Sequence, residues 1–261
     1  SLPNENNYSC MVDQKKFNNR NVFIISPKKV EKTDLTILYF HGGSYMAEAT
    51  KQHWNFIEKI INDTGATVIL PDYPLTPKYH YKDVFNMLEP LYKTIIERIN
   101  PEKLILMGDS AGGGLALALE ESLSDKGVKM PEQTILISPW LDVRLQNPEI
   151  DKVQKYDKEL NKDALKLAGI AYAGANEEGL KSFLVNPIDG DLSKLKNITI
   201  FTGTYDILNP DVKILKERAI KQGIDIDVKE YEGASHIWLL KNLEDNKEEA
   251  EAINNGYNEL I

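Results

Sequence analysis

Short apolar runs alternate with amphipathic segments along most of this chain. The apolar runs have the length of strands and lie at 21–26, 35–40, 66–70, 103–108, 133–137, 198–202 and 226–231. Apolar residues at helical spacing mark 50–62, which Gly65 ends, 83–99, which Pro90 bends or divides, and 211–222. Because strands that alternate with helices form βαβ units, this pattern predicts one α/β domain over 1–261, with a mostly parallel sheet flanked by helices.

Three segments break the alternation. Residues 1–20 are polar and rich in asparagine, and we expect a poorly packed lead-in there. Three prolines between 71 and 77 argue against regular structure. The segment 143–192 is far longer than the roughly 2–6 residues that usually connect a strand and a helix. We expect a helix at 162–172 within it, and we expect the segment to form a partial lid over the carboxyl ends of the strands.

One serine lies where an apolar strand turns into a helix. Residues 108–112 read Gly-Asp-Ser-Ala-Gly, the G-x-S-x-G nucleophile elbow, with an apolar run before and a strong helix former after. The turn exposes the Ser110 hydroxyl and leaves the Ala111 amide at a helix N-terminus, where it can stabilise an oxyanion. A glycine-rich loop with an incidental serine is the alternative, and the strand and helix on either side disfavour it.

A serine nucleophile needs a base, and the base needs an orienting carboxylate. His236 follows the last predicted strand and Asp206 follows the strand before it, so both are expected at the edge that carries Ser110. The order serine, aspartate, histidine is the one found in α/β-hydrolases. Asp206 could instead cap a helix, and the rival acids are Asp142, ranked second because it also follows a strand, and Asp211.

A second glycine cluster directly follows the predicted strand 35–40. It reads His41-Gly42-Gly43, and glycines let backbone amides approach a reacting carbonyl oxygen without obstruction. A simple glycine turn is the alternative. We expect His41 to hydrogen-bond the loop backbone, because a second base has no role here.

Composition excludes several classes of function. A net charge of −9 over 261 residues argues against nucleic-acid or anionic-membrane partners. The single cysteine and four histidines disfavour a zinc site, and no apolar run is long enough to cross a bilayer. The chain has no signal-peptide pattern, and we expect a cytoplasmic location. Because it begins with Ser1 rather than methionine, an N-terminal segment could have been removed, and export after such a loss is the open alternative.

From about Val22 onward the chain resembles the hormone-sensitive-lipase-like esterases of the α/β-hydrolase fold, which carry an HGG oxyanion loop and a GDSAGG elbow. The matching segments are 41–43, 71–77, 108–113, 138–142, 203–208 and His236. The resemblance implies a triad of Ser110, Asp206 and His236. It also implies oxyanion donors at Gly42, Gly43 and Ala111, and no metal or cofactor.

The chain departs from that family at three places. Ser44 replaces a third glycine, and we expect it to be tolerated if only its amide is used. Pro74 and Lys78 replace an arginine and a glutamate, which indicates that a structural ion pair has been replaced. The lead-in is too short to supply the family's N-terminal cap helices, which leaves 143–192 as the only evident lid.

These observations predict a serine carboxylesterase that hydrolyses short-chain acyl esters of small molecules through an acyl-enzyme. An amidase or arylformamidase with the same triad is the alternative, and a non-catalytic binding homologue is a weaker one. The sequence leaves self-association into a homo-oligomer open. Residues next to the catalytic positions could line the substrate pocket, although each could equally be core: Tyr45, Trp140, Ile207, Ile237 and Trp238.

Overall fold

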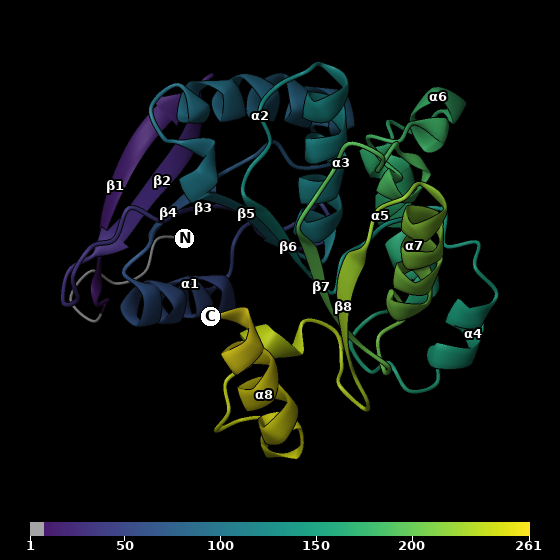
Figure 1. Cartoon of the computed structure of the whole chain (residues 1–261). Coiled ribbons are helices and arrows are strands. Elements are labelled where there is room, and N and C mark those ends of the chain that lie inside the picture. Colours follow the sequence, from purple (N-terminus) through teal and green to yellow (C-terminus); the bar gives the residue numbers. More distant parts are fainter. Residues whose placement is uncertain (1–7) are drawn as a thin grey trace.

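The computed structural model describes residues 8–261 and is built around one eight-stranded sheet (Figure 1). The strand order is β1-β2-β4-β3-β5-β6-β7-β8. The strands are β1 (Cys10–Phe17), β2 (Arg20–Pro27), β3 (Thr36–Phe40), β4 (Thr67–Pro71), β5 (Leu104–Asp109), β6 (Gln133–Ile137), β7 (Ile198–Gly203) and β8 (Ile226–Tyr231). All pairings from β4 to β8 are parallel, while β1–β2 and β2–β4 are antiparallel. The mostly parallel sheet is therefore confirmed.

The first strand corrects the expectation of a poorly packed lead-in. β1 pairs with β2 along its whole length, from Cys10 opposite Pro27 to Phe17 opposite Arg20. Most of its side chains are exposed, so it is held by the backbone ladder and has little hydrophobic periodicity. Residues 1–7, the rest of that expectation, lie outside the described residues.

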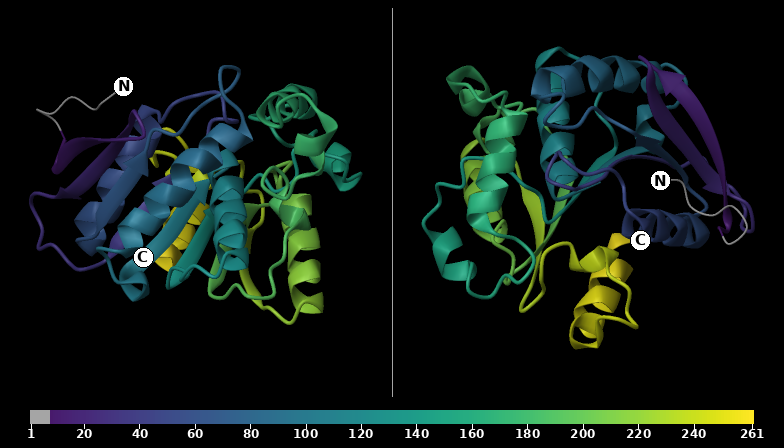
Figure 2. Two further views of the ribbon diagram at one scale, coloured as in Figure 1. Left: turned by 90° about the horizontal axis from the view of Figure 1, so that it is seen from above. Right: turned by 180° about the vertical axis from the view of Figure 1, so that it is seen from behind.

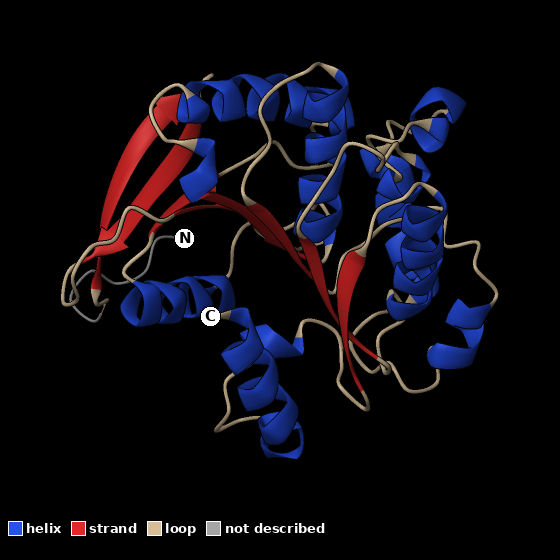
Figure 3. Ribbon diagram, viewed as in Figure 1, coloured by secondary structure: helices blue, strands red, loops and turns tan. Residues whose placement is uncertain are grey.

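Helices cover both faces of the sheet (Figures 2 and 3). Their bounds are α1 (Lys51–Thr64), α2 (Tyr81–Ile96), α3 (Ala111–Asp125), α4 (Glu149–Val153), α5 (Lys162–Tyr172), α6 (Glu177–Lys181), α7 (Asn209–Lys221) and α8 (Ala250–Leu260). Buried side chains of α2, α3 and α7 share one core, and those of α1 and α8 share the other. α1 ends at Gly65 in the left-handed conformation, as expected, but α2 continues through Pro90 as a single helix. α8 was not predicted.

The segment 143–192 contains α4, α5, α6 and a short 3₁₀ turn (η2, Pro187–Asp189). α5 has the predicted bounds. Its last residue, Tyr172, stacks on Tyr45 with 3.5 Å between ring centroids. Tyr45 lies in residues 41–45, the loop after β3 that we call the glycine loop. This segment therefore packs directly on the loop that follows β3. Its action as a lid, and the single-domain organisation, stay predictions.

A guanidinium from β2 supports the proline-rich segment after β4. Arg20 donates to the carbonyl oxygens of Asp72 and Tyr73, and its Nη2 lies 3.4 Å from Asp72 Oδ1. The segment 71–77 thus retains a cation although Pro74 occupies the position where the resembling family has arginine. Within residues 8–261, no helix is both long and apolar enough to cross a membrane.

Candidate active site

Ser110 occupies a strained turn between β5 and α3. Its φ of 53° and ψ of −121° lie outside the regions that ordinary residues prefer. The turn is possible because glycines flank it: a Cβ on Gly108 would lie 2.3 Å from the Gly112 carbonyl oxygen, and one on Gly112 would lie 2.0 Å from that of Phe40. The elbow therefore needs glycine at both positions.

The carboxyl ends of three strands bring Ser110, His236 and Asp206 together. His236 Nε2 lies 2.9 Å from Ser110 Oγ, and His236 Nδ1 lies 2.8 Å from Asp206 Oδ2. Asp206 Oδ1 accepts the amide of Leu208 at 2.8 Å, which fixes the carboxylate. Ser110 follows β5, Asp206 follows β7 and His236 follows β8. This is the geometry of a nucleophile, a base and an orienting acid.

The surroundings of His236 favour its protonated form. Burial alone would lower the pKa of the imidazole, but the negative charge of Asp206 and its hydrogen bond outweigh burial. The net pKa of His236 is raised above its usual value of 6.5. An imidazolium that forms during the reaction would be stabilised in place.

Neither rival acid contacts His236. Asp142 accepts three hydrogen bonds from Arg144, two from the guanidinium at 2.7 and 2.9 Å and one from the backbone amide at 2.8 Å. Asp211 accepts a hydrogen bond from Asn147 at 3.0 Å, and burial raises its pKa to about 6. Both carboxylates have structural partners instead.

The glycine loop corrects one expected oxyanion donor. The Gly42 amide donates to Asp109 Oδ1 at 3.0 Å, so it is not available to substrate. The amides of Gly43 and Ser44 donate no hydrogen bond to any described residue, and both residues are partly exposed. The Ala111 amide, at the N-terminus of α3, is likewise free of the helix ladder. The available donors at this edge are therefore Gly43, Ser44 and Ala111.

Asp109 organises this loop from within the elbow. Its fully buried carboxylate also accepts a hydrogen bond from the Tyr39 hydroxyl at 2.7 Å and lies 3.2 Å from His53 Nε2. Burial alone would raise the pKa of Asp109, but the charge and hydrogen bond of His53 lower it below the usual range. Sequence analysis missed this role, although the position next to Ser110 in the elbow was a usable signal.

His41 supports the loop, as expected. Its Nδ1 lies 2.7 Å from the Gly42 carbonyl oxygen, and its ring stacks on Tyr73 with 4.5 Å between centroids. Burial lowers the pKa of His41 to about 4, so the ring is neutral at ordinary pH. The neutral Nδ1 therefore donates to the carbonyl oxygen.

The candidate pocket residues mostly lie in the core. Tyr45, Trp140, Ile207 and Trp238 are buried, and Ile237 is partly exposed in the left-handed conformation. Trp238 packs in the core of α1 and α8, on the other side of the sheet from Tyr45 and Trp140. Their role as substrate contacts stays a prediction.

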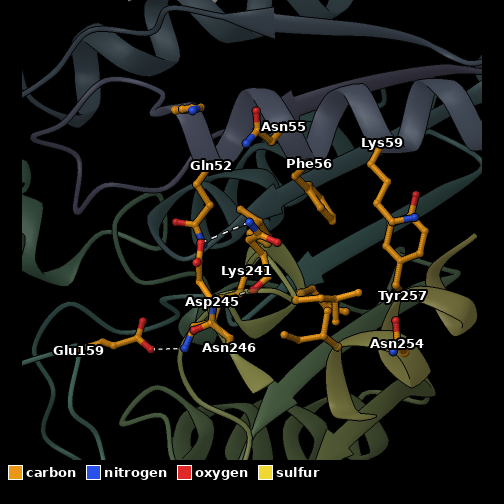
Figure 4. Close-up of a pocket in the computed structure, with 16 residues that line it drawn as sticks. Gln52, Asn55, Phe56, Lys59, Glu159, Lys241, Asp245, Asn246, Asn254 and Tyr257 are labelled. Carbon is orange, nitrogen blue, oxygen red and sulfur yellow. Dashed lines mark hydrogen bonds and ion pairs between the residues drawn. The ribbon is translucent and has the colours of Figure 1, made fainter. Parts of the chain in front are cut away.

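A groove of about 810 Å³ lies between α1 and the C-terminal segment that includes α8 (Figure 4). Gln52 and Asn55 of α1 face Lys241 and Asp245 across it, and no triad residue lines it. Within residues 8–261, no group of three or more histidine, cysteine or acidic side chains is arranged to hold a metal ion.

Known proteins with similar sequences share this architecture. A family model described as the alpha/beta hydrolase fold matches residues 37–240. An esterase from Acinetobacter venetianus is 31% identical over 207 residues, covering 79% of this chain and 68% of the esterase. An acetyl-hydrolase from Streptomyces hygroscopicus is 28% identical over 204 residues, covering 78% of this chain and 68% of that protein.

A solved structure shows the same fold. The crystal structure of an esterase from the bacterial hormone-sensitive lipase family superposes with a TM-score of 0.83 at 24% identity. The match covers 92% of this chain and 79% of that esterase. The family model spans most of the chain, from β3 to the turn after His236, so the protein belongs to the α/β-hydrolase fold family.

Proposed function

We propose that this carboxylic ester hydrolase works through Ser110 as the nucleophile. The single observation that carries the proposal is the continuous hydrogen-bonded line from Ser110 Oγ through His236 to Asp206. Its relatives include proteins named esterase and acetyl-hydrolase, which supports an ester as the substrate.

The geometry supports a two-step acyl transfer. In the first step Ser110 Oγ attacks the ester carbonyl carbon while His236 Nε2 takes the hydroxyl proton. The carbonyl oxygen becomes negative next to the amides of Gly43, Ser44 and Ala111, which favour that charge. When the tetrahedral intermediate collapses, His236 gives the proton to the departing alcohol, and an acyl-serine remains.

In the second step water replaces the alcohol. His236 takes a proton from the water, whose oxygen attacks the acyl carbon, and the carboxylic acid leaves as Ser110 recovers its proton. Throughout, Asp206 keeps the imidazole in the required tautomer and stabilises its positive form. The two steps together hydrolyse one ester bond.

We further propose short acyl groups on a small-molecule alcohol as substrates. A long acyl chain needs an extended apolar surface, because each buried methylene contributes about 0.8 kcal/mol. The segment 143–192 instead begins with a polar stretch, and Glu149, Asp151 and Lys152 of α4 are exposed. This composition favours acetyl to hexanoyl esters. A cytoplasmic location and a homo-oligomer stay predictions.

A panel of substrates tests these proposals. p-Nitrophenyl esters with two to sixteen acyl carbons should be hydrolysed, with kcat/KM highest at the short end. N-formyl arylamines should react more slowly, and a preference for them would favour the amidase alternative. No turnover of any ester, with binding retained, would favour the non-catalytic alternative. A maximum at twelve carbons or more would contradict the short-chain proposal and leave the esterase proposal intact.

A further inference from the structure

A second buried carboxylate lies beside the turn that carries Asp206. It belongs to Asp157, between α4 and α5, whose side chain accepts three backbone amides. Oδ1 accepts those of Glu159 and Leu160 at 2.9 and 2.8 Å, and Oδ2 accepts that of Ile207 at 2.9 Å. Within residues 8–261 its three hydrogen-bond partners are all donors, and these contacts favour the ionised form.

The contact with Ile207 fixes the neighbouring acid. Ile207 directly follows Asp206, and the next amide, that of Leu208, donates to Asp206 Oδ1. Two consecutive amides of one turn are therefore bonded to two different carboxylates. This arrangement leaves Asp206 Oδ2 directed at His236 Nδ1 and ties it to the segment 143–192.

The negative charges near His236 differ in whether a cationic side chain neutralises them. Asp206, Asp157 and Glu159 all favour its protonated form. Glu159 is paired with Lys241, which also contacts Glu249 and Ser235. Asp157 has no ion pair with a cationic side chain in the described part of the chain. Its charge is therefore less neutralised than that of Glu159.

We propose that Asp157 is a second acidic positioning residue of the active site, which holds the Asp206 turn in place and stabilises the His236 imidazolium through its uncompensated charge. The inference rests on the proposed function of the triad. Burial raises the pKa of Asp157 above its usual value of 3.8, and its three amide contacts offset that rise only in part. Asp157 does not touch substrate and acts through Asp206 and His236.

The substitution D157N removes the negative charge of Asp157 and keeps a side chain of nearly the same shape. An asparagine oxygen can still accept the Glu159 and Leu160 amides, but its NH₂ group then faces the Ile207 amide, and the negative charge is lost. We expect kcat for p-nitrophenyl acetate to fall by roughly tenfold with little change in KM. The acidic limb of the pH profile should move down by about half a unit to one unit, because an imidazole with fewer anions nearby protonates at lower pH.

Three variants make the result specific. D157E keeps the charge and should leave the limb at the wild-type pH, whatever its kcat. D157S keeps an acceptor for the turn but no charge, so it should shift the limb like D157N and serves if D157N fails to fold. D225N is the control, since Asp225 is exposed in the turn between α7 and β8, outside the segment 143–192. It should leave rate and limb unchanged.

Failure of the Asp157 proposal can be distinguished from failure of the proposed function. If the wild-type protein hydrolyses esters and S110A does not, the triad stands. If D157N and D157S then fold and keep the wild-type limb, the role of Asp157 is refuted even if their melting temperatures fall. A wild-type protein that hydrolyses no ester refutes the proposed function itself.

Discussion

Hydrogen bonds to individual carboxylates determine which amides and side chains near Ser110 remain unpaired. Asp109 binds the Gly42 amide, which commits the first amide of the glycine loop to structure. Asp206 uses one oxygen for its own turn and the other for His236. Arg144 binds Asp142, so that acid is held away from catalysis. The chemistry of the site follows from which hydrogen bonds are already made.

The assignment of Asp206 as the orienting acid can be tested by replacing single aspartates with asparagine. We expect D206N to reduce kcat by several orders of magnitude, because the imidazole loses the partner that sets its tautomer. S110A and H236A should be similarly severe. D142N should have a mild effect, since its partner is Arg144. Steady-state kinetics on a p-nitrophenyl ester measure these rates, and a crippled D142N with a mild D206N would reverse the assignment.

The pH dependence of the reaction should reflect His236. The ring acts as a base only when neutral, and its pKa is raised above 6.5. Activity should therefore be full above that raised pKa and fall as the pH drops through it. A pH-stat profile of kcat/KM gives the limb directly. A limb at or below 6.5 would show that Asp206 does not stabilise the imidazolium in the free enzyme.

Among the elements, α3 begins at the candidate active site and carries buried carboxyl groups further along. Its N-terminus presents the Ala111 amide, whereas Glu120 and Glu121 further along are buried. Glu120 accepts a hydrogen bond from the Thr134 hydroxyl through one oxygen, and its other oxygen and both of Glu121 make no hydrogen bond within residues 8–261. Burial raises the pKa of Glu120 to about 7. The folded protein therefore prefers Glu120 protonated.

This preference makes the stability of the protein depend on pH. The stabilising contribution of protonated Glu120 is present below its ordinary pKa of 4.5 and is lost as the pH rises through about 7. E120Q should raise the melting temperature at pH 8 by several degrees and leave it nearly unchanged at pH 4, since a glutamine oxygen can still accept from Thr134. Thermal unfolding by circular dichroism measures this. E251Q on the exposed face of α8 is the control, and an equal effect of both variants would contradict the prediction.

The elements differ in how far the sequence could predict them. β3 and α5 were predicted because continuous apolar runs and helical spacing are local signals. β1 was missed because its stability comes from pairing with β2, which leaves most of its side chains exposed. The Asp157 contact was also missed, because it joins residues 50 positions apart through a backbone amide. No local pattern encodes such a contact.

For the whole molecule, the parallel sheet explains why the candidate site residues could be grouped from the sequence. Motifs after consecutive parallel strands must meet at one edge, so Ser110, Asp206 and His236 could be grouped from their order alone. The same argument could not decide which loop amides stay free, because that depends on atoms such as Asp109 Oδ1. Topology fixes which loops meet, and individual hydrogen bonds fix what each loop can do.

The two edges of the sheet have a consequence for assembly. β1 exposes Asp13, Lys15 and Lys16, and the outer strand β8 carries Asp227 and Lys229. Burying such charges against another strand costs free energy, and edge strands with charged side chains resist continuation of the sheet into a neighbouring molecule. Concentrated solutions of this protein should therefore be protected from strand-to-strand aggregation.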